Sequence, residues 1–397
     1  MKRLNLLIIV FLATFALTAC AAPTRIMGDA WDYQLKVEEL GLPGVWTLGE
    51  ANLLTAYDLQ AGGIVTPTAS LANAQQVYTV RYQPSESSQF GDYTLEIVIF
   101  PSVADADFAL NVETLSEEWR RVESAPSLGD ASRVWSFVSP DDTIKQGLFR
   151  VDFRYLNAIV SVTLLGSANV LPDATEPLNQ ARKVLAKLQA AAEPPQLSRL
   201  RSAQTPDLRT LLLTQLQLAE VVPANGSAWS VNPRLLPGWT NNEDFGSKEA
   251  QQLLQQLGRV TGYQMWLVKP PAAEAASIDP GAGLFQQVSA YQRADATANG
   301  LQSMIGIQGA AEASPPPPVG EAARAWRALV PSKQSNGAEA VIAATEISFR
   351  VGQYVASVQL QSQLITDVSS PAVLNENYDL AVKLAQALEQ NLRATKP

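Results

Sequence analysis

The hydrophobic and polar positions of the chain follow two periods, and the elements that they predict occur in series. Runs rich in β-branched and aromatic residues at 77–82 and 93–100 predict two strands separated by a polar loop. Apolar residues in 102–122 recur at spacings of three and four, which predicts a helix with one buried face. Two or three strands are expected within 132–166, and a helix over 176–192 completes the series.

Four short segments of the first half recur in the same order in the second half, displaced by 190 to 196 residues. This agreement in order and spacing predicts a tandem duplication, with two unrelated domains as the alternative. The matching pairs are LPGVWT at 42–47 and LPGWT at 236–240, ADA at 104–106 and 294–296, GDASRVW at 129–135 and GEAARAW at 320–326, and FRYLNAIVSV at 153–162 and FRVGQYVASV at 349–358.

The length of the repeat indicates two globular domains, because solenoid repeats are only about 20–45 residues long. In the second copy, helices are expected over 208–220 and 375–392. Successive strands are expected to be joined by turns more often than by helices. We therefore predict an α+β fold of two tandem homologous domains, each a largely antiparallel sheet packed with helices.

The N-terminus has the pattern of an export signal. Lys2 and Arg3 precede an apolar run over 4–17, which is shorter than the roughly 20 residues that a membrane span needs. The run ends in Leu17-Thr18-Ala19-Cys20, which resembles the lipobox of bacterial lipoproteins. The resemblance implies that Cys20 receives a diacylglyceryl group and that cleavage falls before it. An uncleaved anchor helix and an ordinary signal peptide are the alternatives, but an exported protein with one free thiol would carry a reactive liability.

These patterns predict the organisation and location of the chain. It is expected to face outside the cytoplasm, lipid-anchored to the cell membrane, or to an outer membrane if the organism has one. The predicted segments are a signal peptide at 1–19, a lipidated tether at 20–27, the first α+β repeat at 28–193, a linker at 194–207 and the second repeat at 208–397.

Composition excludes several functions. Cleavage would leave 27 basic and 38 acidic residues, a net charge of −11, which disfavours nucleic acid as a partner. Histidine is absent and Cys20 is the only cysteine, which excludes histidine-based catalysis and zinc sites with histidine or thiolate ligands. Nucleotide-binding, hydrolase and calcium-loop motifs are also absent. We expect no cofactor and no resident metal.

Two pairs of arginines occupy equivalent positions in the repeat: Arg133 with Arg324, and Arg154 with Arg350. Each pair is expected either to form a structural salt bridge or carbonyl clamp, or to contact an anionic ligand. The tryptophans of the repeat have two similar interpretations, as core anchors or as a sugar-stacking platform. They are Trp46, Trp135, Trp239 and Trp326.

Acidic residues offer the remaining catalytic chemistry. Five of them fall on the helix expected over 102–122, where a solvated helix face is the simpler interpretation. They are Asp105, Asp107, Glu113, Glu117 and Glu118. A hydrolase would need two carboxyl groups about 5–9.5 Å apart in a cleft, at least one of them desolvated. The turn at Asp141-Asp142 lacks the ligands that calcium requires.

The sequence therefore predicts a non-enzymatic binding or assembly protein, anchored by its lipid, with a protein or a small molecule as its partner. The alternative is a secreted, carboxylate-dependent hydrolase acting on glycans or peptides. The layout is similar to that of sensor-type and PsbP-like lipoprotein domains, which implies binding or assembly. The run Pro315–Pro318 is expected to be a stiff surface loop or a docking segment for an aromatic groove.

Overall fold

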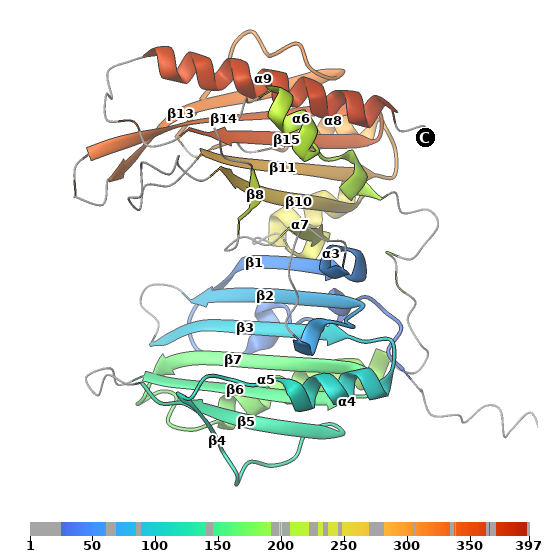
Figure 1. Cartoon of the computed structure of the whole chain (residues 1–397), viewed down its shortest axis with the longest axis vertical. Coiled ribbons are helices and arrows are strands. Elements are labelled where there is room, and N and C mark those ends of the chain that lie inside the picture. Colours follow the sequence, from blue (N-terminus) through green and yellow to red (C-terminus); the bar gives the residue numbers. More distant parts are fainter. Residues whose placement is uncertain are drawn as a thin grey trace, which may run out of the picture. The chain divides into compact units, whose positions relative to one another are not determined.

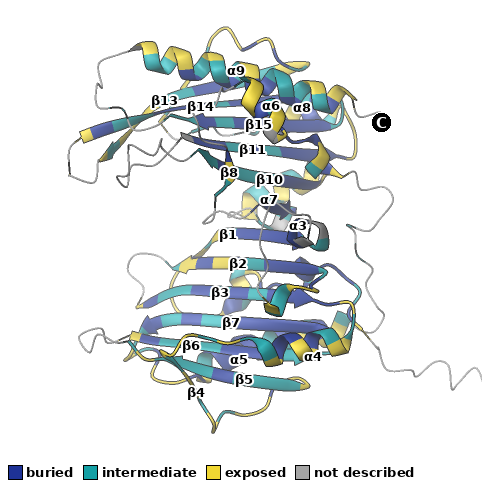
Figure 2. Cartoon of the chain, viewed as in Figure 1, coloured by how far each residue is buried: buried dark blue, intermediate teal, exposed yellow. Residues whose placement is uncertain are grey.

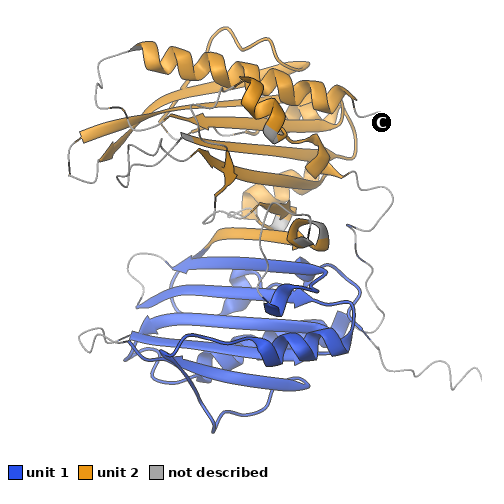
Figure 3. Ribbon diagram, in the orientation of Figure 1, with its two compact units in different colours: residues 1–47, 67–202 blue, residues 48–66, 203–397 orange. Residues whose placement is uncertain are grey.

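The chain folds into two compact units, which Figure 3 distinguishes by colour. Unit 1 comprises residues 1–47 and 67–202, and unit 2 comprises 48–66 and 203–397. The computed structural model describes residues 25–60, 69–84, 89–139, 146–191, 198, 200, 207–221, 229–232, 237–244, 248–269, 282–304, 306–307, 309–333, 337, 339–362, 365 and 371–394. Cys20 and the pair Asp141-Asp142 lie outside these residues. Within them, no helix has the length and apolar character needed to cross a membrane.

Unit 1 contains one antiparallel sheet in the strand order β2-β3-β7-β6-β5-β4. Its strands are β2 (Gln76–Pro84), β3 (Phe90–Ile99), β4 (Trp119–Arg121), β5 (Ala131–Phe137), β6 (Gln146–Tyr155) and β7 (Ala158–Ser167). Its helices are η1 (Ala30–Tyr33), α2 (Val37–Leu40), η2 (Ala69–Leu71), α4 (Val103–Val112) and α5 (Thr175–Ala191).

Helices α4 and α5 cover opposite faces of this sheet (Figure 1). The α5 face is the apolar core, because α5 packs on β6 and β7 and buries Ala181, Val184 and Leu188 at spacings of three and four. Buried strand residues such as Val160 and Val162 complete this core. Figure 2 shows long buried stretches along β3 and β7. The helix predicted over 176–192 is therefore confirmed within one residue at each end.

Helix α4 and the segment that follows it differ from the prediction. The helix expected over 102–122 ends at Val112, and Phe108 is 58% exposed instead of lying on a buried face. Further along, Trp119 lies in β4, where it pairs with Phe137 of β5 at a ring-centroid distance of 5.4 Å. The spacing of three and four was misleading because cross-strand pairing at the sheet edge determines the conformation of Trp119.

The strands of unit 2 are also antiparallel, in the order β12-β13-β14-β15-β11-β10-β9-β1, and β8 pairs with β10. Its strands are most of β1 (Trp46–Thr55, of which 48–55 belong to unit 2), β8 (Ser230–Val231), β9 (Gly238–Thr240), β10 (Arg259–Lys269), β11 (Ala282–Tyr291), β12 (Ala311–Glu312), β13 (Ala322–Lys333), β14 (Glu339–Val351) and β15 (Tyr354–Gln361). Its helices are α3 (Ala56–Gln60), η3 (Leu208–Leu211), α6 (Gln215–Val221), η4 (Asn242–Asp244), α7 (Lys248–Gln256), α8 (Ala296–Gln302) and α9 (Pro371–Ala394).

The segment 48–66 belongs to unit 2, although it precedes most of unit 1 in the sequence. Asp58 is buried and accepts hydrogen bonds from the Tyr263 hydroxyl at 2.8 Å and the Thr55 backbone N–H at 2.7 Å. Arg209 approaches the same carboxylate at 3.6 Å. These polar contacts tie the segment to the core of unit 2, which no local sequence pattern indicates.

The helix expected over 208–220 is interrupted in the structure. The 3-10 helix η3 ends before Leu212, and α6 begins only after Thr214. The backbone N–H of Leu213 donates to Gln286 Oε1 at 2.8 Å, which takes it out of any helical pattern. The C-terminal helix expected over 375–392 is confirmed as α9, which is a few residues longer and packs on β14 and β15. The α+β class is also confirmed.

Candidate functional site

Arg154 and Arg350 each make the same two contacts with an acidic residue that follows a glycine, one through the side chain and one through the backbone carbonyl. Arg154 donates to the Asp130 carboxylate at 3.1 Å, and the Asp130 backbone N–H donates to the Arg154 carbonyl at 2.8 Å. Arg350 forms an ion pair with Glu321 at 2.9 Å, and the Glu321 backbone N–H donates to the Arg350 carbonyl at 2.9 Å. Both arginines thus act inside their own unit, as the structural alternative expects.

In each unit, the glycine before the acidic residue allows the backbone to approach the arginine carbonyl closely. Gly129 and Gly320 have φ values of 63° and 65°, in the left-handed region. A Cβ atom at these positions would lie 2.3 Å from the Arg154 carbonyl oxygen and 2.5 Å from the Arg350 carbonyl oxygen. The recurring segments GDASRVW and GEAARAW therefore begin at equivalent turns.

Arg133 and Arg324 contact the C-terminal end of a helix. Arg133 donates to the Asn111 side chain of α4 at 2.8 Å. Arg324 donates to the carbonyls of Gln302 at 2.9 Å and Met304 at 3.1 Å, and forms an ion pair with Glu312 at 2.8 Å. These contacts again fit the structural interpretation. Three tryptophans of the repeat, Trp46, Trp239 and Trp326, are buried in the manner of core anchors.

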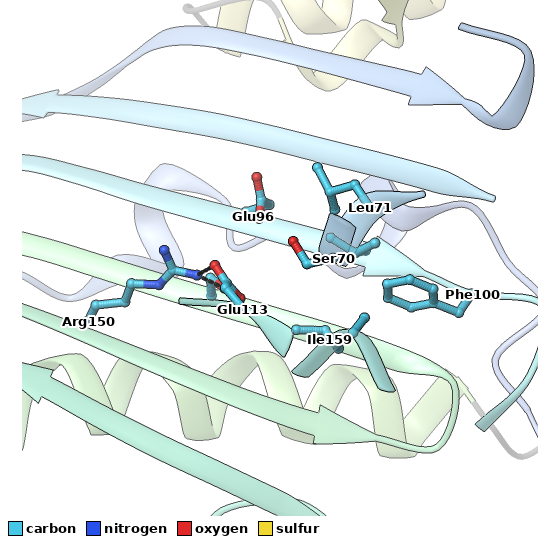
Figure 4. Close-up of a pocket in the computed structure, with 10 residues that line it drawn as sticks. Ser70, Leu71, Glu96, Phe100, Glu113, Arg150 and Ile159 are labelled. Carbon is cyan, nitrogen blue, oxygen red and sulfur yellow. Dashed lines mark hydrogen bonds and ion pairs between the residues drawn. The ribbon is translucent and has the colours of Figure 1, made fainter. Parts of the chain in front are cut away.

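A cavity of about 210 Å³ lies in unit 1, between the sheet and the helices α4 and η2 (Figure 4). One part of its wall is apolar, and the other carries carboxylates, a guanidinium and hydroxyls. The apolar lining is Leu71, Val98, Phe100, Ala109 and Ile159, and the polar lining is Ser70, Glu96, Glu113, Arg150 and Ser161. None of the four arginines discussed above lines it.

The strand register places the polar residues side by side. Ser161 of β7 pairs with Glu96 of β3 on one side and with Asp152 of β6 on the other. Arg150 lies two residues before Asp152, and therefore on the same face of the sheet. Glu113 reaches this face from the residue that caps the C-terminus of α4.

Arg150 is the centre of the charged cluster. It donates to Asp152 at 2.6 Å and to Ser161 at 3.2 Å, and it forms an ion pair with Glu113. The second oxygen of Asp152 accepts from the Trp135 indole N–H at 2.9 Å. Burial disfavours the charged form of Arg150, but the charges of Asp152 and Glu113 outweigh it and raise its pKa.

Glu96 has a different environment. Within the described residues its carboxyl group has no hydrogen bond and no ion pair within 4.0 Å, although it faces the same cavity. Burial raises the pKa of Glu96 to about 7, Arg150 opposes this rise, and Glu113 and Asp152 add to it. An unpaired carboxyl group in a cavity, with its pKa raised by burial, is a candidate functional group.

The sequence prediction missed Glu96 and Arg150. The available signal was the charged residue inside TLEIVIF and the Arg-x-Asp pair inside LFRVDFRY, both within otherwise apolar strands. Glu113 was expected on a solvated helix face, and this was wrong, because it follows the helix and pairs with Arg150. Glu117 and Glu118 are exposed, but they lie beyond the helix.

Unit 2 does not repeat the cluster. The pair Ser348–Ser357 has the register of Asp152–Ser161, and Gln287 pairs with Ser357 where Glu96 pairs with Ser161. Two residues before Ser348 stands Glu346, in place of an arginine. The charged group is therefore particular to unit 1. Across the described parts of both units, no group of three or more acidic, histidine or cysteine side chains is arranged to hold a metal ion.

Comparisons with known proteins identify no family. No protein-family model and no curated protein matches the sequence. The extracellular domain of PknH from Mycobacterium tuberculosis is similar over 46% of this chain and 95% of its own, with 10% identity and a TM-score of 0.28. The di-domain ARO/CYC StfQ from the steffimycin biosynthetic pathway is similar over 88% of this chain and 100% of its own, with 9% identity and a TM-score of 0.17. These likenesses are too weak to carry an argument.

Proposed function

We propose that the chain is a membrane-anchored extracytoplasmic lipoprotein with a non-catalytic binding role, and that the unit 1 cavity is its small-molecule site. The observation that carries the binding role is a cavity with an apolar wall facing an unpaired carboxyl group. Ligand sites in proteins combine apolar walls with a few placed polar groups in this way. The support for the anchor is the sequence Leu17-Thr18-Ala19-Cys20.

We further propose that the two units arose by tandem duplication. The strand orders β3-β7-β6-β5 and β11-β15-β14-β13 correspond. The contacts between a glycine, an acidic residue and an arginine support the same relation. In unit 1 they are made by Gly129, Asp130 and Arg154, and in unit 2 by Gly320, Glu321 and Arg350. In this proposal unit 1 carries the small-molecule site, and unit 2 lacks its charged residues.

The binding role is tested by methyl NMR of the mature chain with a panel of small apolar probes. Leu71, Val98 and Ile159 line the cavity and should shift on binding, whereas Leu384 in the core of unit 2 should not. Ala109→Met places a larger side chain in the cavity and should abolish these shifts while the chain stays folded. Shifts in neither unit, or equal shifts in both, contradict the proposed site.

The anchor is tested by metabolic labelling with a fatty acid in a bacterial host. The wild type should incorporate label, and Cys20→Ser should not and should be released from membranes. Label on the Ser variant, or none on the wild type, contradicts the lipid attachment.

A second candidate function is a carboxylate-dependent hydrolase acting on glycans or peptides. The observation that favours it is that Glu96, with its raised pKa, and the salt-bridged Glu113 line one cavity. A raised carboxyl pKa suits a general acid. Turnover of a glycan or peptide that Glu96→Gln abolishes and Glu346→Gln leaves intact would establish this function in place of the first.

A further inference from the structure

We propose that the unit 1 cavity takes a cationic amine with a compact apolar body, whose ammonium group lies against the Glu96 carboxylate. The inference rests on the proposed binding role of this cavity and adds the chemical class of the ligand. Three properties of the cavity lead to it: the balance of charge, the state of each polar group and the size of the apolar wall.

The charge balance of the cavity is negative. Arg150 supplies one positive charge, and Glu113 and Asp152, both paired with it, supply two negative charges. Ionised Glu96 adds a third. The residues paired directly with Glu96 on the neighbouring strands are neutral, namely Ser161 of β7 and Thr79 of β2, and Arg81 further along β2 is paired with Asp92. Electrostatic complementarity therefore favours a cation.

The polar groups of the cavity are unequally satisfied. Arg150 already donates to two carboxylates and a hydroxyl, so an anionic ligand would compete with bonds that exist. Glu96 accepts no hydrogen bond from any described residue, and it is therefore the group that gains most from a donor. An ammonium group brings both the donor and the charge that Glu96 lacks.

The size of the cavity limits the apolar part of the ligand. A dry apolar cavity of about 150 Å³ holds one benzene molecule. A cavity of about 210 Å³ therefore has room for a six-membered ring and a short polar arm. Phe100, Leu71 and Ile159 form a wall against which the ring can pack, on the side away from the charged cluster (Figure 4). Benzylammonium fits this description.

Binding of such a cation should release a proton. Because burial raises the pKa of Glu96 to about 7, its carboxyl group is partly protonated at neutral pH, and an adjacent ammonium group favours the ionised form. A benzylammonium ion stays charged throughout this pH range. Its affinity should therefore rise from pH 5.5 to pH 8, with release of a fraction of a proton per molecule bound near neutral pH.

The experiment is calorimetric titration of the mature chain with benzylammonium, benzyl alcohol and benzoate, which share a ring and differ in charge. We expect benzylammonium to bind about tenfold or more tightly than benzyl alcohol, because a hydrogen bond to a charged group is the stronger kind. Benzoate should not bind. Titration in buffers of different ionisation enthalpy measures the released proton.

Two matched variants assign the effect to Glu96. Glu96→Gln should reduce benzylammonium binding to the level of benzyl alcohol and eliminate the proton release. Glu346→Gln removes a half-buried strand carboxyl group of unit 2 and should change neither. Benzyl alcohol or benzoate binding as tightly as benzylammonium overturns the amine inference but leaves the binding site in place. If no probe binds and the methyl NMR panel also shows no shifts, both proposals fail.

Discussion

Replacing Glu96 by glutamine should stabilise unit 1 at high pH and leave it nearly unchanged at low pH. Glu96 is a carboxyl group that folding moves from water to a partly apolar cavity without a hydrogen-bond donor. Its ionised form is therefore destabilised in the folded chain. Glutamine has the same shape and resembles the protonated acid, so it removes only the cost of the charge.

The size and sign of the effect follow from the pKa. Burial raises the pKa of Glu96 from 4.5 to about 7. Between these values the folded chain binds more protons than the unfolded chain, so the stability of the wild type falls as the pH rises from about 4.5 to about 7 and is constant above. The difference between the two pKa values corresponds to a loss of about 3 kcal/mol in the free energy of unfolding, because one pKa unit is worth about 1.4 kcal/mol.

Hydrogen–deuterium exchange of the β3 and β7 peptides measures this effect in the full mature chain, because it reports on unit 1 separately. At pH 8, Glu96→Gln should increase the opening free energy by about 3 kcal/mol, and at pH 4 the two proteins should agree. Glu117→Gln, at an exposed carboxyl group, is the matched control and should change nothing at either pH. An equal effect of Glu96→Gln at both pH values, or destabilisation at pH 8, would refute the reasoning.

Two further substitutions test the contacts around the site. Arg150→Met leaves Glu113 and Asp152 without their shared cation and should destabilise unit 1 by about 3 kcal/mol or more in urea unfolding, whereas an unchanged midpoint would contradict a structural role for the cluster. Gly129→Ala forces a Cβ against the Arg154 carbonyl and should cost about 2 kcal/mol or more; Gly337→Ala, which has a positive φ but no neighbour within 4 Å, should cost less, and equal costs would rule out the steric explanation.

The cavity shows why sequence patterns identified the frame of unit 1 and missed its site. Helix α5 was predictable because its buried residues, Ala181, Val184 and Leu188, repeat with the helical period within one short segment. Glu96, Glu113 and Arg150 come from three separate segments, and no pattern within one segment shows that they meet. The register of β3, β7 and β6 brings them together, and register depends on pairing between strands far apart in the sequence.

Local patterns by themselves determined the α+β class and the helices α5 and α9, because each depends on residues within short stretches of the chain. The tertiary structure decided what those patterns left open. Helix α4 ends at Val112, and Trp119 beyond it pairs with Phe137 between the edge strand β4 and its neighbour β5. The tertiary structure also grouped 48–66 with unit 2, and it left Glu96 unpaired beside a satisfied Arg150. The burial of a side chain and the charges around it depend on residues that only the folded chain brings together. The chemistry of the site therefore depends on the tertiary structure.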